Sequence, residues 1–222
     1  MIKAVMFDLD NTLIDFMRIK SASVKAAVNA MVGAGLPLNK EEATKKLYEV
    51  YWKTGIEYQR IFQKFLREVT GKIDYRILAM GIVAYRNQQN QIIGPYPQVL
   101  PTLLKLKERG LKLAIVTDAP RLKAWIRMTE IKLQDFFDVV VTFEDTGKHK
   151  PDPAPFRLAL KRLGLKPTEC LMVGDWPEKD IKGAKSLGIK TAFAKYGALK
   201  PATVTADYNL KSIEDVLKIT EE

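Results

Sequence analysis

Acidic and hydroxyl residues follow an apolar run near the start of this chain, in a pattern suited to holding a metal ion. The run AVMF at residues 4–7 leads directly to Asp8 and Asp10, and Thr12 comes soon after. Carboxylates placed this close together repel each other unless a cation lies between them. Oxygen ligands of this kind are those that Mg²⁺ prefers. The pattern therefore predicts a magnesium site that begins at Asp8.

Similar polar residues follow three later apolar runs. Thr117 and Asp118 follow the second run, Lys150 lies in the segment after the third, and Asp175 and Asp180 follow the fourth. One such residue after a strand is usually a turn former or a helix cap. Four groups at corresponding places favour a shared site instead. A phosphorylated substrate would suit this site, because phosphate oxygens complete the shell of Mg²⁺ and a lysine neutralises the remaining charge.

The elements that must position these residues alternate regularly after residue 94. The expected strands are residues 3–7, 112–118, 138–143, 170–175 and 190–197, with a weak last strand at 206–210. The expected helices are residues 98–110, 121–131, 152–164, 178–188 and 212–219. This alternation predicts an α/β fold, with a Rossmann-like parallel sheet covered by helices on both faces. Ligands of such sheets bind beyond the carboxyl ends of the strands, where the polar residues lie.

The segment between the first strand and the alternating region carries only helix patterns. The expected helices are residues 19–35, 39–55, 57–71 and 74–90, with caps at Asn39 and Asp74. Four helices with short connections indicate a smaller four-helix bundle. We therefore expect a core domain of residues 1–14 and 95–222 with an inserted helical domain of residues 15–94.

Charge and hydropathy narrow the class of protein. The net charge is +10, from 36 lysines and arginines against 26 acids. The basic residues are interleaved with glutamates on helix patterns and form no nucleic-acid-binding motif, so we expect no nucleic-acid partner. No run approaches the roughly 18 apolar residues of a membrane helix, and the first residues lead into a strand rather than a signal peptide. We expect a cytoplasmic protein without a membrane partner; the sequence predicts no particular oligomeric state.

Four short motifs in this order resemble those of a known family. They are DLDNT at residues 8–12, VTD at 116–118, KP at 150–151 and GDWPEKD at 174–180. The chain resembles the haloacid dehalogenase superfamily, in its phosphohydrolase branch. The predicted helical domain falls where that family carries a helical cap inserted after the first motif.

The resemblance implies a role for each matching residue. Asp8 would be the nucleophile that forms an aspartyl-phosphate, and Asp10 would be the general acid and then the general base. The other implied roles are phosphate binding by Thr117, by the backbone N–H of Asp118 and by Lys150, and Mg²⁺ binding by Asp8, the backbone carbonyl of Asp10, Asp175 and Asp180. The implied substrate is a small phosphorylated metabolite.

Other reactions of the family remain as alternatives. A sugar-phosphate mutase carries the same four motifs and differs chiefly in excluding water while the phosphoryl group is held. Haloacid dehalogenation is disfavoured, because dehalogenases of this fold have no acid at the position of Asp10. Phosphonate cleavage would need a desolvated lysine in the helical domain, and no lysine there is marked as one. A partner-binding protein with a vestigial site is disfavoured by the intact motifs.

Overall fold

A six-stranded parallel sheet forms the centre of the larger unit in the computed structural model, which describes residues 1–201 and 204–221. The strand order is β3-β2-β1-β4-β5-β6, and every neighbouring pair is parallel. The strands are β1 (Ala4–Phe7), β2 (Lys112–Val116), β3 (Val139–Val141), β4 (Cys170–Gly174), β5 (Lys190–Ala194) and β6 (Tyr208–Leu210). The predicted α/β class is confirmed, and the weak strand expected at 206–210 is present as β6.

The register of the sheet brings the ends of its central strands level. Phe7 of β1 pairs with Ile115 of β2 and with Val173 of β4. β1 and β4 are apolar and buried along their whole length, as is usual for central strands covered on both faces. The residues that follow β1, β2 and β4 therefore leave the sheet at the same edge.

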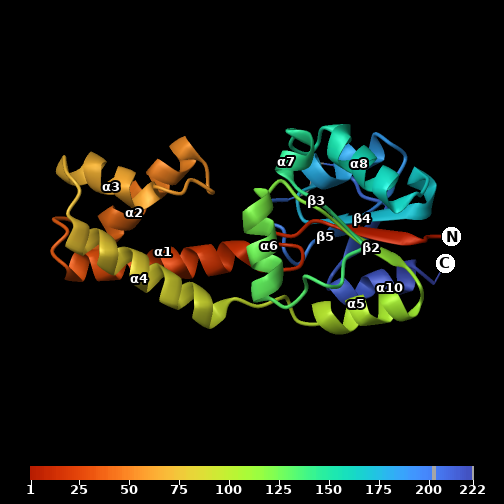
Figure 1. The fold of residues 1–222 in the computed structure, drawn as a ribbon, viewed down its shortest axis with the longest axis horizontal. Helices are drawn as coiled ribbons and strands as arrows, with labels where there is room; N and C mark the ends of the chain where they lie inside the picture. Colours follow the sequence, from red (N-terminus) through yellow and green to blue (C-terminus); the bar gives the residue numbers. More distant parts are fainter. Residues whose placement is uncertain (202–203, 222) are drawn as a thin grey trace. The chain divides into compact units, whose positions relative to one another are not determined.

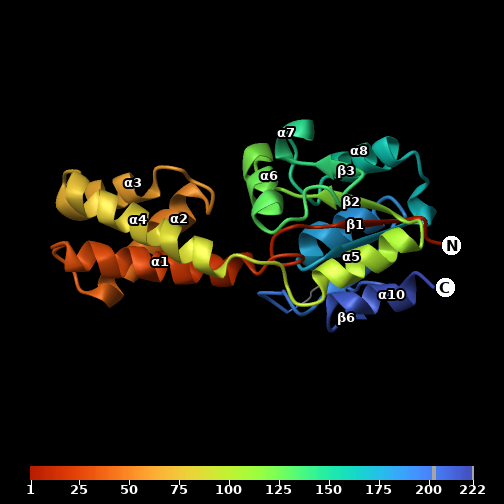
Figure 2. The ribbon, with the colours of Figure 1, turned by 60° about the horizontal axis from the view of Figure 1, so that its bottom comes forward.

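Helices cover both faces of this sheet. They are α5 (Val99–Glu108), α6 (Arg121–Glu130), α7 (Phe143–Thr146), α8 (Pro153–Leu163), α9 (Lys182–Lys185) and α10 (Val216–Ile219). Figures 1 and 2 show α8 on one face and α5 with α10 on the other. Phe156 and Leu160 of α8 pack with Ala4 and Met6 of β1 in one apolar cluster. The predicted layer of helices on each face is confirmed.

Three helical segments differ from the expectation. The helix expected at 178–188 is a π-helical turn (Pro177–Ile181) followed by the short α9, and the helix expected at 212–219 is a 3₁₀ turn (Ile213–Asp215) followed by α10. The π-helical turn carries Asp180, whose side chain accepts the backbone N–H of Trp176 at 3.0 Å, so this end of the segment is shaped by a side-chain contact. The short α7 was not expected; a capping box between Thr142 and Asp145 begins it.

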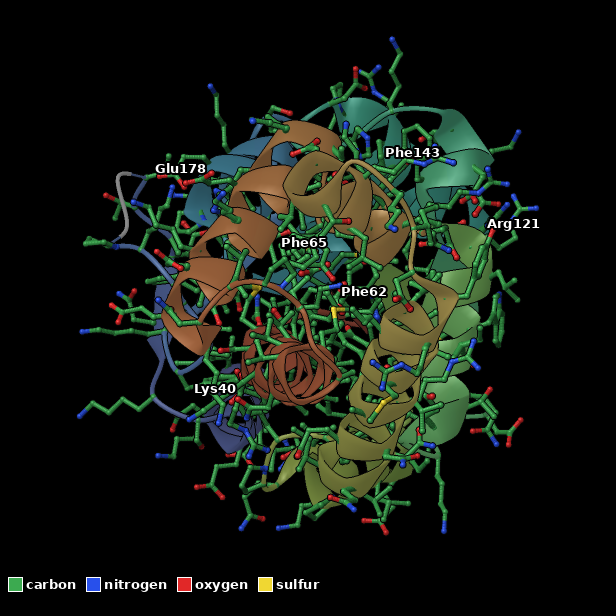
Figure 3. The ribbon with its side chains drawn as sticks, turned by 90° about the vertical axis from the view of Figure 1, so that its left-hand side faces the viewer. Lys40, Phe62, Phe65, Arg121, Phe143 and Glu178 are labelled. Carbon is green, nitrogen blue, oxygen red and sulfur yellow. The ribbon has the colours of Figure 1, made fainter. Side chains whose placement is uncertain are left out.

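Residues 17–93 form a second compact unit, separate from the unit made by residues 1–16 and the chain from Gly94 onward. Its helices are α1 (Phe16–Gly33), α2 (Lys40–Thr54), α3 (Ile61–Thr70) and α4 (Tyr75–Ile92). Phe62 and Phe65 of α3, labelled in Figure 3, belong to the apolar core of this unit. The predicted set of four helices is thus confirmed.

The ends of these helices follow from local contacts. Asn39 accepts the N–H of Glu42, and Asp74 accepts the N–H groups of Arg76 and Ile77, so both predicted caps are confirmed. α3 begins later than expected, because the N–H of Tyr58 bonds to the carbonyl of Gly55 in a turn.

Among the described residues, no helix is both long enough and apolar enough to cross a membrane.

Candidate active site

Three buried carboxylates meet at the carboxyl edge of the sheet. Asp8 follows β1, and its backbone N–H extends the β1–β4 ladder by bonding to the carbonyl of Val173 at 2.9 Å. Asp175 follows β4, and Asp180 lies in the π-helical turn after it. Each of these three offers a carboxylate oxygen, and the three oxygens lie within 4.8 Å of one another. The structure thus brings together three side chains that the sequence placed in one site.

Burial disfavours the ionised form of two of these carboxylates. Burial, together with the charges of Asp8 and Asp180, raises the pKa of Asp175 to about 9. Burial also raises the pKa of Asp180 to about 6, although the Lys150 ammonium opposes this shift. A divalent cation would favour the ionised form of all three groups. The donor set therefore fits a hard, oxygen-seeking metal ion.

A glycine without a side chain and a threonine hydroxyl fix the positions of two of these carboxylates. A Cβ atom built on Gly174, the last residue of β4, would overlap the carboxyl group of Asp180, so only glycine leaves room for that side chain. The hydroxyl of Thr12 donates to Oδ1 of Asp175 at 3.2 Å. The loop that carries Thr12 is in turn held by the hydroxyl of Tyr196, which donates to the Thr12 carbonyl at 2.8 Å.

Lys150 lies between two of the three carboxylates and is almost fully buried. Its Nζ donates to Oδ1 of Asp8 at 2.7 Å, to Oδ1 of Asp180 at 2.6 Å and to the carbonyl of Val116 at 2.9 Å. Burial lowers the pKa of Lys150, but the charges of Asp180, Asp8 and Asp118 outweigh burial and raise the pKa above its usual value. This lysine is therefore a permanent positive charge in contact with Asp8.

Thr117 and Asp118 come directly after β2, as expected. The hydroxyl of Thr117 accepts the backbone N–H of Ala119 at 3.1 Å, which forms a tight turn. The carboxylate of Asp118 accepts the backbone N–H of Lys150 at 2.8 Å and Nζ of Lys179 at 2.8 Å. Burial raises the pKa of Asp118, but Lys150 and Lys179 outweigh burial and lower it. Both carboxylate oxygens of Asp118 are thus tied to neighbouring loops.

Asp10 has a cation as its neighbour. Its Oδ2 forms an ion pair with Nη1 of Arg127 at 2.6 Å, and its side chain is not one of the three clustered carboxylates. The sequence motifs included Asp10 but not Arg127, so the ion pair between them was not predicted. The one available signal was spacing, since Arg127 lies beside Met128 and three residues after Ala124 on the buried stripe of α6. Lys179 was also missed, although it lies within the fourth motif.

Comparison with known proteins agrees with this arrangement. The haloacid dehalogenase-like hydrolase family matches residues 5–194, and the chain belongs to that family. Over 223 residues the chain is 36% identical to a glyceraldehyde 3-phosphate phosphatase of Methanocaldococcus jannaschii, covering 100% of this chain and 98% of the relative. It is 31% identical over 226 residues to the pyrophosphatase PpaX of Bacillus velezensis, covering 99% and 96%.

A solved structure shows the same fold over the whole chain. The structure of a phosphatase of this family from Thermococcus onnurineus has a TM-score of 0.71 and 28% identity, and it covers 99% of this chain and 98% of that chain. The predicted family and the predicted hydrolysis of phosphate esters are confirmed by these relatives. The chain is thus an enzyme of the phosphatase branch.

Proposed function

We propose that this chain is a Mg²⁺-dependent phosphatase that transfers the phosphoryl group of a small metabolite to Asp8 and then to water. The single observation that supports this most is that Asp8 contacts a buried lysine and lies within 4.8 Å of two further buried carboxylates. The stability of the fold does not explain why Asp8, Asp175 and Asp180 lie together near Lys150, because buried charges are costly even when paired.

Asp8 is the proposed nucleophile. Its carboxylate is held by Lys150 at one oxygen, which fixes the rotation of the side chain toward the edge of the sheet. Lys150 also carries the positive charge that an incoming phosphoryl group requires. A bound Mg²⁺ would offset the negative charge of the phosphoryl group beside these carboxylates, and Asp8, Asp175 and Asp180 with the carbonyl of Asp10 are the proposed ligands.

Asp10 is the proposed proton carrier. When Asp8 attacks phosphorus, Asp10 gives a proton to the leaving alcohol; it then takes a proton from the water that cleaves the aspartyl-phosphate. Thr117 and the backbone N–H of Asp118 are the proposed contacts of the phosphate oxygens. The ties of the Asp118 carboxylate to Lys150 and Lys179 hold that segment of backbone still.

The relatives suggest which metabolite to test first. We propose glyceraldehyde 3-phosphate as the leading candidate, because a relative with this name is 36% identical over the whole chain. Pyrophosphate is the second candidate, because the 31% identical relative is a pyrophosphatase. The net charge of +10 would speed the encounter with either anion.

The first prediction concerns the Asp8→Asn variant. We expect phosphate release from glyceraldehyde 3-phosphate and from p-nitrophenyl phosphate to fall by at least about 1,000-fold, because an amide cannot act as the nucleophile. The exposed Asp135 gives a matched control, and Asp135→Asn should keep the wild-type rate. EDTA should abolish the activity and Mg²⁺ should restore it. An Asp8→Asn enzyme as fast as the wild type would refute the proposal.

A further inference from the structure

Arg127 is a buried cation outside the four motifs. It lies on α6, and its side chain is only 9% exposed. Buried arginines are rare and need a partner, because desolvation of a guanidinium is costly. Here Nη1 of Arg127 donates to Oδ2 of Asp10 at 2.6 Å. The partner of this cation is thus the group to which we assign proton transfer.

The same guanidinium makes a second contact on the segment that carries Asp10. Its Cζ lies 4.3 Å from the centre of the Phe16 ring, a cation–π arrangement. Phe16 is the last residue of the larger unit before the chain enters the helical unit. Arg127 therefore contacts the segment after β1 at two points, the Asp10 carboxylate and the Phe16 ring.

A purely structural ion pair would explain the burial, since it would attach α6 to the loop after β1. The geometry supports a more specific role. A carboxyl group can turn about two side-chain bonds, and efficient proton transfer requires a fixed position within hydrogen-bond reach of the reacting atom. An arginine held on an aromatic ring presents its N–H groups in a fixed plane, which a flexible lysine does not.

We propose that Arg127 is a positioning residue that holds Asp10 in place for proton transfer to the leaving group. This inference rests on the proposed function. Arg127 exchanges no proton itself; it acts through Oδ2 of Asp10, and the Phe16 ring holds the guanidinium. The role predicts a dependence on the leaving group, because only a poor leaving group needs a proton from Asp10.

The test compares two substrates in the variant Arg127→Met. p-Nitrophenolate leaves without a proton, whereas the alcohol released from glyceraldehyde 3-phosphate needs one. We expect kcat/KM for glyceraldehyde 3-phosphate to fall by about 100-fold, as for a misplaced general acid, and kcat/KM for p-nitrophenyl phosphate to fall by less than about threefold. Arg127→Lys keeps the charge but loses the fixed plane, so it should lie between the wild type and Arg127→Met on glyceraldehyde 3-phosphate.

Controls separate this role from stability. Arg157 is an exposed arginine on α8, and Arg157→Met should leave both values of kcat/KM unchanged. In an Asp10→Asn background, Arg127→Met should cause no further loss, because residues that act through one another are not additive. If Arg127→Met does not fold, the comparison of the two substrates on Arg127→Lys decides the question.

Two results would overturn the inference. One is an equal loss for both substrates in a folded variant, and the other is an additive loss in the Asp10→Asn background. Either result would leave Arg127 as a structural ion pair and would leave the proposed function intact. A different result, full activity of Asp8→Asn, would contradict the proposed function.

Discussion

At the scale of the residue, Lys150 is the buried cation that contacts two of the three clustered carboxylates. An ammonium group has three N–H donors, and those of Lys150 meet Asp8, Asp180 and the carbonyl of Val116. A buried ammonium whose three donors are all bonded holds the carboxylates of Asp8 and Asp180 close together. Lys150 therefore offsets part of the negative charge of these two groups.

Replacement of this lysine by methionine tests that account. Lys150→Met should lower the free energy of unfolding by about 3–5 kcal/mol in EDTA, because it leaves buried carboxylates without their cation. Mg²⁺ should recover part of this loss, and phosphatase activity should stay very low because the contact with Asp8 is gone. Urea unfolding with and without Mg²⁺ measures the first effect. Lys161→Met, at an exposed position of α8, is the control. If Lys150→Met were as stable as this control, Lys150 would not stabilise the buried carboxylates.

Residue types and spacing predicted the acidic cluster, since Asp8, Asp175 and Asp180 each follow a recognisable apolar run. They did not predict Arg127 or Lys179. These two cations lie on helical segments and contact loops that follow other strands. Such pairings depend on how strands are ordered in the sheet, and short-range patterns contain no information on that order.

At the scale of the element, the short helix α7 shows how one carboxylate joins several segments. The carboxylate of Asp145 accepts hydrogen bonds from the backbone N–H and the hydroxyl of Thr142, each at 2.8 Å, and from Nη2 of Arg162 on α8 at 2.8 Å. Arg121 at the start of α6 lies 3.3 Å from the same carboxylate. Burial raises the pKa of Asp145, but the contacts with Thr142 and Arg162 outweigh burial and lower it.

The lowered pKa predicts a pH-dependent effect of Asp145→Asn. A carboxyl group with a lower pKa in the folded state stabilises the protein above its unfolded pKa, and this stabilisation is lost as the pH falls through the folded value. We expect Asp145→Asn to lower the free energy of unfolding by about 1–2 kcal/mol at neutral pH. The difference from the wild type should shrink as the pH falls below the unfolded pKa of an aspartate, about 3.9.

Urea unfolding at neutral and acidic pH measures this effect. Glu108→Gln, at an exposed position at the end of α5, is the matched control for the change from a carboxyl group to an amide. A constant difference between Asp145→Asn and the wild type across this pH range would mean that the ionised carboxylate does not hold α7.

Helix caps were the most predictable feature at this scale, because Asn39 and Asp74 bond to N–H groups two or three residues away. The π-helical turn at Pro177–Ile181 was not predictable from periodicity. Its shape follows from the contact of Asp180 with Trp176 and from the burial of Asp180 against Gly174. Both contacts involve a side chain of the candidate active site, so helix propensity alone does not predict them.

At the scale of the whole molecule, each of the two units has an apolar core of its own among the described residues. One core contains Phe65 and residues of the four helices α1–α4, and another contains Phe156 and residues of the sheet. The alternation of helix and strand patterns predicted a parallel sheet next to a helical segment. The strand order with β1 in the middle was not predictable, because it depends on pairing between residues more than 100 positions apart.

Separate cores predict separate effects of cavity mutations. Phe65→Ala and Phe156→Ala should each lower the free energy of unfolding of their own unit by about 3–5 kcal/mol. In hydrogen exchange, Phe65→Ala should speed the exchange of amides in α1–α4 and leave β1 and β4 protected. Phe156→Ala should speed the exchange of amides in the strands and helices of the larger unit and leave α1–α4 protected. Faster exchange in both units of both variants would show that the two cores unfold as one.

The central claim is that Asp8 takes up phosphorus covalently, and a crystal structure with beryllofluoride and Mg²⁺ tests it most directly. Beryllofluoride imitates a phosphoryl group bonded to a carboxylate. We predict that beryllium will be bonded to a carboxylate oxygen of Asp8, with Mg²⁺ bound by Asp8 and Asp175. Beryllium bonded to another side chain, or beryllofluoride bound away from Asp8, would contradict the account.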